Sequence, residues 1–210
     1  MARDDERHAR SQEEPIVDGL PDVPGIGVAM RLTPGLGLHL RGLADEVLVN
    51  DFPGATIQRH EREMLATAVS AANDCFFCMD SHAAHAGALL ERENATEMEP
   101  VVEVIKSGSS EGVSDKMAAL LHIARTVQRA PLTLTRADVA AAHEAGASDG
   151  DVQLAVLIAS AFSMYNRLVD GFRARTAPST EAYRARAVEI ADNGYGAAIP
   201  SGAGAPPPSS

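Results

Sequence analysis

Apolar residues recur at three- and four-residue steps along most of the chain, which is the period of an amphipathic helix. A break at Asn73-Asp74 separates two such stretches, and these two residues suit the start of a second helix that runs to about Arg92. The other predicted helices span residues 36–49, 64–72, 94–105, 115–129, 136–144, 152–173 and 180–191. No alternating Val/Ile/Thr run bounded by turns exceeds a few residues, so the sequence predicts an all-α fold.

Polar residues and glycines mark several helix ends. Ser114 and Thr135 are expected to cap the helices that follow them, and Gly146 to end the second of these. Pro100 is a candidate interruption of the helix around it. The helix from residue 152 is apolar nearly all round as far as Phe162, which is typical of a helix central to a bundle or buried in a subunit interface.

Composition divides the chain into three parts. Residues 1–14 are charged and lack periodicity, and residues 193–210 are rich in Gly, Ala, Pro and Ser, so both are predicted to be disordered tails. Residues 15–192 form the predicted helical domain, which opens with a Pro/Gly-rich arm over 15–34. The apolar residues of this arm indicate that it packs on the domain itself or on a neighbouring subunit.

Charge and hydropathy exclude several partner classes. The formal net charge is −11 and no Lys/Arg-rich run occurs, which argues against binding to nucleic acid or to an anionic membrane. The N-terminus has no apolar signal segment, and the longest apolar run, 154–165, is too short to span a bilayer. We therefore expect a cytoplasmic protein.

The candidate chemistry gathers in one stretch. Cys75 and Cys78 are the only cysteines, and His82 follows four residues later, so helical spacing places all three on one face. A helix N-terminus favours a thiolate, and an imidazole beside a thiol can accept its proton. Glu63, on the preceding helix, could orient His82 if the two helices pack side by side.

Other interpretations of these residues stay open. The cysteine pair could bind zinc with His82 and a carboxylate or His85, or the two cysteines could simply pack as small apolar residues. Glu63 lies on the face of Thr67 and Ser70, so a solvated glutamate is its simpler interpretation, and Glu61 competes for any acidic role. Residues 164–167 could reach the thiols, although core packing with a cap-like bond from Asn166 is preferred.

The spacing Glu-x(11)-Cys-x-x-Cys-x-x-x-His resembles the motif of the alkylhydroperoxidase D-like (AhpD-like) proteins of the carboxymuconolactone decarboxylase superfamily. Three further segments resemble the sequences of the peroxidase-related branch: the residues directly before the cysteines, the stretch from Leu132 to Gly146, and residues 166–172. The resemblance extends over about 21–175. The best-known members carry a histidine between the cysteines, where this chain has Phe76 and Phe77.

The resemblance implies an AhpD-like helical domain that assembles as a trimer or hexamer. It implies that Cys78 attacks a peroxide, Cys75 resolves the product, and His82 and Glu63 relay protons. The reductant it implies is a lipoyl-type or thioredoxin-like dithiol, with no cofactor and no metal. The expected activity is a thiol-dependent alkylhydroperoxide reductase in antioxidant defence. A thiol–disulfide oxidoreductase, a redox sensor and a non-catalytic helical assembly module remain alternatives, and the sequence does not specify the peroxide.

Overall fold

The structure is a computed structural model that describes residues 16–196, and all regular secondary structure in this range is helical. The predicted all-α fold is therefore confirmed. The helices are α2 (Gly27–Leu32), α3 (Pro34–Leu48), α4 (Arg59–Ala72), α5 (Phe76–Glu93), α6 (Glu99–Lys106), α7 (Asp115–Arg129), α8 (Arg136–Glu144), α9 (Asp149–Gly171) and α10 (Thr180–Asn193), with short 3-10 helices at Thr96–Met98 and Pro131–Thr133.

The predicted caps at Ser114 and Thr135 are confirmed. The hydroxyl of Ser114 accepts a hydrogen bond from the backbone N–H of Met117, at 3.2 Å. Thr135 forms a capping box with Asp138, in which each side chain accepts from the other residue's backbone N–H. Such caps satisfy N–H groups that have no partner within the helix, and they fix the starts of α7 and α8.

Two predicted helix boundaries are wrong. Pro100 does not interrupt a helix but lies in the first turn of α6, where its missing N–H costs nothing. The helix predicted from residue 152 begins at Asp149, because Ser148 and Asp151 form a capping box one turn earlier. Hydrophobic periodicity marks apolar residues only, so it missed the polar first turn of α9, in which Gly150 and Asp151 are buried.

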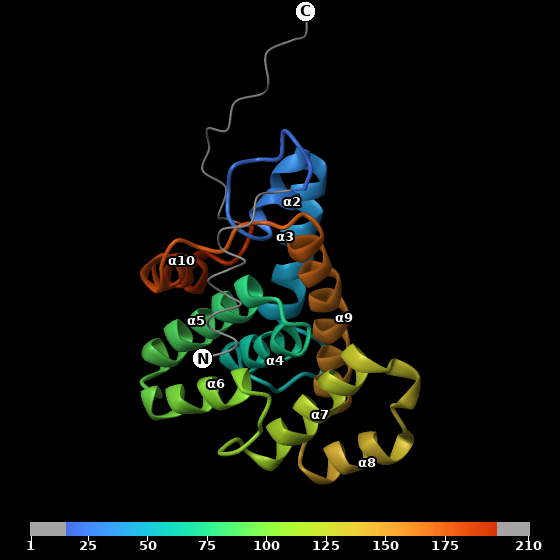
Figure 1. Ribbon diagram of the computed structural model, residues 1–210. Coiled ribbons are helices and arrows are strands. Elements are labelled where there is room, and N and C mark those ends of the chain that lie inside the picture. Colours follow the sequence, from blue (N-terminus) through green and yellow to red (C-terminus); the bar gives the residue numbers. More distant parts are fainter. Residues whose placement is uncertain (1–15, 197–210) are drawn as a thin grey trace, which may run out of the picture.

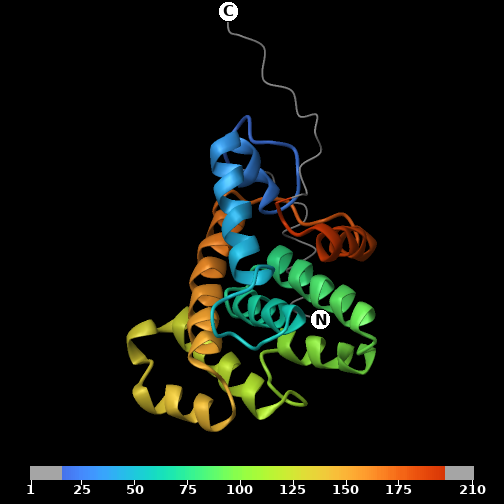
Figure 2. The same ribbon diagram turned by 180° about the vertical axis from the view of Figure 1, so that it is seen from behind.

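The helical hairpin of α4 and α5 forms the centre of the molecule, and these two helices pack more extensively than any other pair of described elements. Figures 1 and 2 show α9 running along one side of this hairpin and α10 lying across α5 on the opposite side. α2 lies at one end of the molecule, and α8 lies at the other (Figure 1). The hairpin is thus enclosed by segments from both halves of the chain.

α9 supplies much of the core. Its buried residues, among them Leu154, Ile158 and Phe162, join a single large apolar cluster with residues of α3, α4, α5 and α7. By length and apolar composition alone α9 could also span a membrane, but half of the relevant window is buried inside the fold, as in the core helix of a globular bundle.

Asp151 joins the start of α9 to the loop that leads into α4. Its buried carboxylate accepts hydrogen bonds from the backbone N–H groups of Thr56 and Ile57, at 2.6 and 2.9 Å, and lies 3.0 Å from Nζ of Lys116. Burial alone would raise the pKa of Asp151, but these donors outweigh it and hold the pKa well below the ordinary value. Asp151 therefore stays ionised and fixes the entry to α4.

The predicted first tail, residues 1–14, lies outside the described residues, as does 197–210 of the second. Tyr195, within the stretch that composition assigned to the second tail, is buried with 8% of its surface exposed. Its contacts belong to the candidate site.

Candidate active site

The turn between α4 and α5 places the two cysteines. Asp74 has a left-handed backbone (φ 55°), and the N–H of Cys75 donates to the carbonyl of Ser70 at 3.0 Å. Cys75 itself is the N-cap of α5, so the predicted caps at Asn73 and Asp74 are wrong. Asn73 instead ends α4, because the chain uses the two polar residues to turn and not to start the next helix.

Both thiols are reduced, buried and close together. Cys75 and Cys78 are 0% and 3% exposed, and they form an apolar cluster with Val169 of α9. A hydrogen bond with the Cys78 side chain, together with burial, raises the pKa of the Cys75 thiol far above its ordinary value. Cys75 therefore holds its proton.

The N-terminal arm and the segment after α9 cover this thiol pair. Ile26 of the arm and Ala174 after α9 pack on the cysteine cluster, as does Phe77. The N–H of Gly25 donates to the carbonyl of Arg175 at 2.9 Å, and the side chains of Asp22 and Arg175 form an ion pair. The arm thus packs on its own domain, one of the two arrangements that its apolar residues indicated.

Glu63 lies beside His82, as the predicted packing of the two helices requires. Oε2 of Glu63 lies 2.6 Å from Nδ1 of His82, and Nδ1 of His85 lies 3.7 Å from the same oxygen. Glu63 is 1% exposed, so its interpretation as a solvated glutamate is wrong. Burial would raise the pKa of Glu63, but the hydrogen bond with His82 and the nearby His85 lower it to about 2, and the residue is a carboxylate.

Glu61, the rival acid, has a different task. Its carboxylate accepts from the backbone N–H of Gln58 at 2.8 Å and completes the capping box that starts α4. Capping stabilises the first turn, and it directs the Glu61 carboxylate to the backbone of Gln58 instead of to His82. Of the two acids, only Glu63 contacts the histidines.

Asn166 fixes the turn that carries the cysteines. Its Nδ2 donates to Oγ of Ser70 at 3.0 Å, and its Oδ1 accepts from Nδ2 of Asn73 at 2.8 Å. Asn166 is 1% exposed, and Ser70 is the residue whose carbonyl accepts from Cys75. The preferred interpretation, core packing with cap-like bonds, therefore describes Asn166 correctly.

Tyr195 is the residue of this cluster that the sequence did not indicate. Its hydroxyl lies 2.9 Å from Oε1 of Glu63, 2.9 Å from Nδ1 of His85 and 3.4 Å from Nδ1 of His82. The one available signal was an aromatic residue, one of three tyrosines in the chain, within a Gly/Ala-rich stretch. Such a stretch has no periodicity from which a buried position could be predicted.

The ligand types present also allow a metal to be considered. One nitrogen each of His82 and His85 and one oxygen of Glu63 lie within 4.8 Å of one another, and all three residues are buried. The cysteines are not part of this group, so among residues 16–196 the zinc arrangement built on the Cys pair does not form. The same atoms are already paired through protons, which a bound metal would have to displace.

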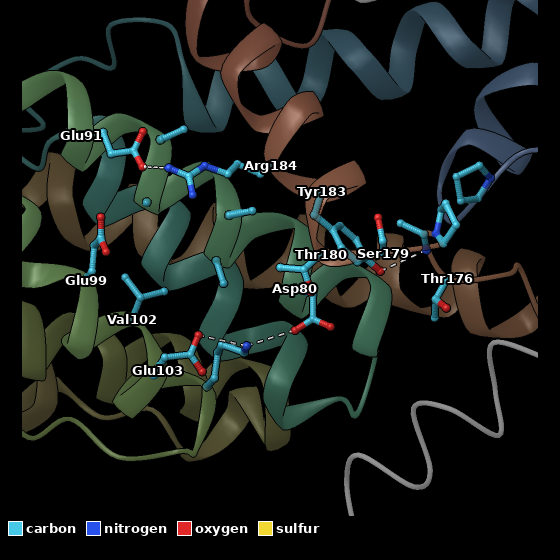
Figure 3. Close-up of a pocket in the computed structure, with 18 of the residues that line it drawn as sticks. Asp80, Glu91, Glu99, Val102, Glu103, Thr176, Ser179, Thr180, Tyr183 and Arg184 are labelled. Atoms are coloured by element: carbon cyan, nitrogen blue, oxygen red, sulfur yellow. Dashed lines mark hydrogen bonds and ion pairs between the residues drawn. The ribbon is translucent and has the colours of Figure 1, made fainter.

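A groove of about 940 Å³ lies along α5, α6 and the segment that leads into α10 (Figure 3). Its wall carries both signs of charge, with Lys106 between Asp80 and Glu103 and Arg184 paired to Glu91. Tyr183 lines the groove, and its ring lies 5.7 Å from that of Phe77, which packs on the cysteines. The groove therefore approaches the thiols through this ring pair.

These features define a class of protein: a helical domain with a buried dithiol at the start of one helix and an acid–histidine pair beside it. Residues 43–126 match the model of the carboxymuconolactone decarboxylase family. Among curated proteins, none matches the chain. The chain is thus similar to this family over residues 43–126, and it has the AhpD-like fold that its motif predicted.

Two solved structures support the assignment of the fold. One is the alkylhydroperoxidase AhpD core, an uncharacterized peroxidase-related protein from Ralstonia eutropha JMP134, with 24% identity, a TM-score of 0.64, and coverage of 77% of this chain and 80% of that chain. The other is an uncharacterized peroxidase-related protein from Silicibacter sp. TM1040, with 19% identity, a TM-score of 0.63, and coverage of 82% and 93%.

Proposed function

We propose that this protein reduces hydroperoxides with the Cys75–Cys78 pair, and that Glu63 and His82 manage the protons. The observation that carries the proposal is the packing of the two buried thiols in one cluster, with His82 one turn after Cys78 and 2.6 Å from Glu63. A redox dithiol needs two sulfurs close enough to form a disulfide, and a proton acceptor nearby.

The proposed reaction balances without a cofactor. The Cys78 thiol gives its proton to His82, and the thiolate attacks the peroxide, so that the O–O bond breaks and an S–O bond forms. The leaving alkoxide takes the proton back from His82 and departs as an alcohol. The Cys75 thiol then condenses with the sulfenic acid of Cys78, which gives a disulfide and water.

The state of Cys75 supports this division of roles. A resolving cysteine has to remain a thiol until the sulfenic acid forms, and the raised pKa of Cys75 keeps it protonated. A protonated Cys75 thus suits the resolving role, which leaves the attack on the peroxide to Cys78.

An external dithiol completes the cycle by exchange with the Cys75–Cys78 disulfide, and it leaves oxidised. We propose a lipoyl-type or thioredoxin-like dithiol that approaches along the groove lined by Tyr183. The thiols themselves are buried, so exchange requires the cover formed by Ile26 and Ala174 to open.

We also propose that the chain forms a homo-oligomer, a trimer or hexamer, through helical faces. Several large apolar side chains on α2, α3 and α9 are exposed between 37% and 63%: Leu32, Leu36, Leu38, Leu43, Leu157 and Met164. Exposed apolar side chains on neighbouring helices are typical of association surfaces. Light scattering of the purified chain measures the subunit number.

Mass spectrometry of the reduced chain, before and after one equivalent of hydroperoxide, tests the proposed reaction. We expect a loss of two hydrogens in the wild type, a gain of one oxygen in Cys75→Ser, and no change in Cys78→Ser. Peroxide consumption with a dithiol donor is expected to cease in both variants. Disulfide formation without catalytic peroxide consumption would instead favour a thiol–disulfide exchanger or redox sensor.

A further inference from the structure

The chain after α10 returns to the centre of the molecule and is fixed there through its backbone. Oδ1 of Asp45, on α3, accepts from the N–H of Tyr195 at 2.6 Å, and Oδ2 accepts from the N–H of Gly196 at 2.8 Å. Gly194 has a left-handed φ of 73°, and a Cβ there would lie 2.9 Å from Oδ1 of Asp45. The position of residue 195 therefore depends on Asp45 and Gly194, whatever its side chain.

The Tyr195 side chain enters the Glu63–His82–His85 cluster from this anchored segment. Its ring packs edge-on against His85, with centroids 5.6 Å apart, and its hydroxyl contacts Glu63 and both histidines. Burial and the nearby charge of Glu63 hold the pKa of Tyr195 well above its ordinary value. The phenol therefore keeps its single proton.

The number of protons on these groups determines which atom donates and which accepts in each short contact. The Glu63 carboxylate has no proton, so it accepts on Oε2 from Nδ1–H of His82 and on Oε1 from the Tyr195 hydroxyl. The Tyr195 oxygen then accepts from Nδ1–H of His85, which burial keeps neutral by lowering its pKa. Both histidines consequently carry their proton on Nδ1, and Nε2 of each has a lone pair.

We propose that Tyr195 is a positioning residue of the thiol chemistry: its hydroxyl holds Glu63, His82 and His85 in one hydrogen-bonded chain that leaves Nε2 of His82 free to accept a proton. This rests on the proposed function, in which that proton comes from Cys78. When the Cys78 S–H bond breaks, an N–H bond forms at Nε2 of His82, and Glu63 stabilises the imidazolium.

His85 and the segment 194–196 thereby become parts of the site. Without the Tyr195 hydroxyl, Oε1 of Glu63 and Nδ1 of His85 lose this hydrogen-bond partner, and Glu63 can turn toward His85, whose Nδ1 lies 3.7 Å from Oε2. His82 would then lose the bond that fixes its tautomer. Groups that orient a first ligand or base commonly change activity about 10- to 100-fold when they are removed.

The test uses the reduced full chain with Tyr195→Phe, and Tyr165→Phe as its matched control. Tyr165 is also buried, and its hydroxyl donates to the carbonyl of Leu40 at 2.7 Å, away from the histidines. The readout is the pH profile of iodoacetamide alkylation in a Cys75→Ser background, with peroxide consumption measured separately. We expect alkylation of Tyr195→Phe at pH 7 to fall about tenfold, with a profile displaced to higher pH, and Tyr165→Phe to follow its parent.

A second variant alters the position of Tyr195 through the backbone that Asp45 holds. Asp45→Asn weakens the anchor but keeps the Tyr195 hydroxyl, so we expect it to displace the alkylation profile in the same direction. The alkylation profile of the double variant, Asp45→Asn with Tyr195→Phe, should be displaced little more than that of Tyr195→Phe alone, because both changes act on one unit. A general loss of stability would also displace the profile of Tyr165→Phe, whereas lost positioning would displace only the profiles of the Tyr195 and Asp45 variants.

Two results would overturn the proposal, and a third would reject only the peroxidase function on which it rests. An unchanged alkylation profile in Tyr195→Phe would overturn it and leave the proposed peroxidase function standing if Cys78→Ser is inactive. A displaced profile with no peroxide consumption by the wild type would retain Tyr195 as a positioning residue and reject the peroxidase. One equivalent of zinc per chain that is lost in Tyr195→Phe would replace the proton chain with a metal site.

Discussion

Nδ1 of His82 on α5 lies 2.6 Å from Oε2 of Glu63 on α4, although nineteen residues separate the two in sequence. Both side chains are buried, and the pKa of Glu63 is lowered to about 2 by this bond and by the nearby His85, against the effect of burial. A carboxylate held next to an imidazole in a water-poor site stabilises the imidazolium form when His82 takes a proton.

Glu63→Gln removes that negative charge while nearly preserving the shape of the side chain. We expect kcat/KM for hydroperoxide to fall about 100-fold, since positioned acid–base groups contribute about 10²- to 10⁴-fold. Glu61→Gln is the matched control on the same helix, because it alters only the capping box and costs about 1 kcal/mol of stability. Steady-state assays in which both variants turn over equally would remove Glu63 from the mechanism.

The free energy of unfolding should fall as the pH drops below about 6.5. Burial lowers the pKa of His85 from 6.5, so below that pH the unfolded state binds the proton more readily and gains stability relative to the folded state. Below about 4.5 the unfolded state also takes up the proton that Glu63, with a pKa of about 2, resists in the fold. The groups that face His85 are Glu63, His82, Tyr195 and, at longer range, Arg186.

Urea denaturation at a series of pH values measures this dependence. His85→Gln should flatten the decline between pH 6.5 and 4.5, whereas His39→Gln, at an exposed position, should leave the slope unchanged. A wild-type unfolding free energy that stays constant from pH 8 to pH 5 would contradict the assignment of a neutral His85.

Asp151→Asn should destabilise the fold by about 3 kcal/mol, because it removes a buried charge that several donors require. Asp149→Asn is its control, since Asp149 lies in the same first turn of α9 with 83% of its side chain exposed. Chemical denaturation measures both. Equal stability of the two variants would show that the Thr56–Ile57 loop does not depend on the Asp151 carboxylate.

Gly25→Ala should loosen the cover over the thiols. Gly25 has a φ of +56°, and a Cβ there would overlap the ring of Phe77, which packs on the cysteines. If the closed cover is destabilised by about 1–2 kcal/mol, the population of molecules with exposed thiols rises about 5- to 30-fold. The cysteines should therefore be alkylated faster. Gly19→Ala shares the positive φ (+74°) but meets nothing within 4 Å, so its alkylation rate should change less. Indistinguishable rates for the two variants would rule out Phe77 as the link between arm and thiols.

The sequence by itself determined the helical class, most helix ranges, the caps at Ser114 and Thr135, and the cysteine pair with His82 one turn later. These features are local: helical periodicity, capping and i, i+4 spacing act within a few residues, so the chain carries them whatever surrounds it.

Only the tertiary structure decided that Glu63 and not Glu61 contacts His82, that Cys75 and not Asp74 caps α5, and that Tyr195 joins the site. Glu63 and His82 meet because α4 and α5 pack as a hairpin, and Tyr195 arrives from more than a hundred residues away, held by Asp45. Such contacts depend on how helices pack and on which polar groups must be satisfied once buried, and neither is encoded in the pattern of a single segment.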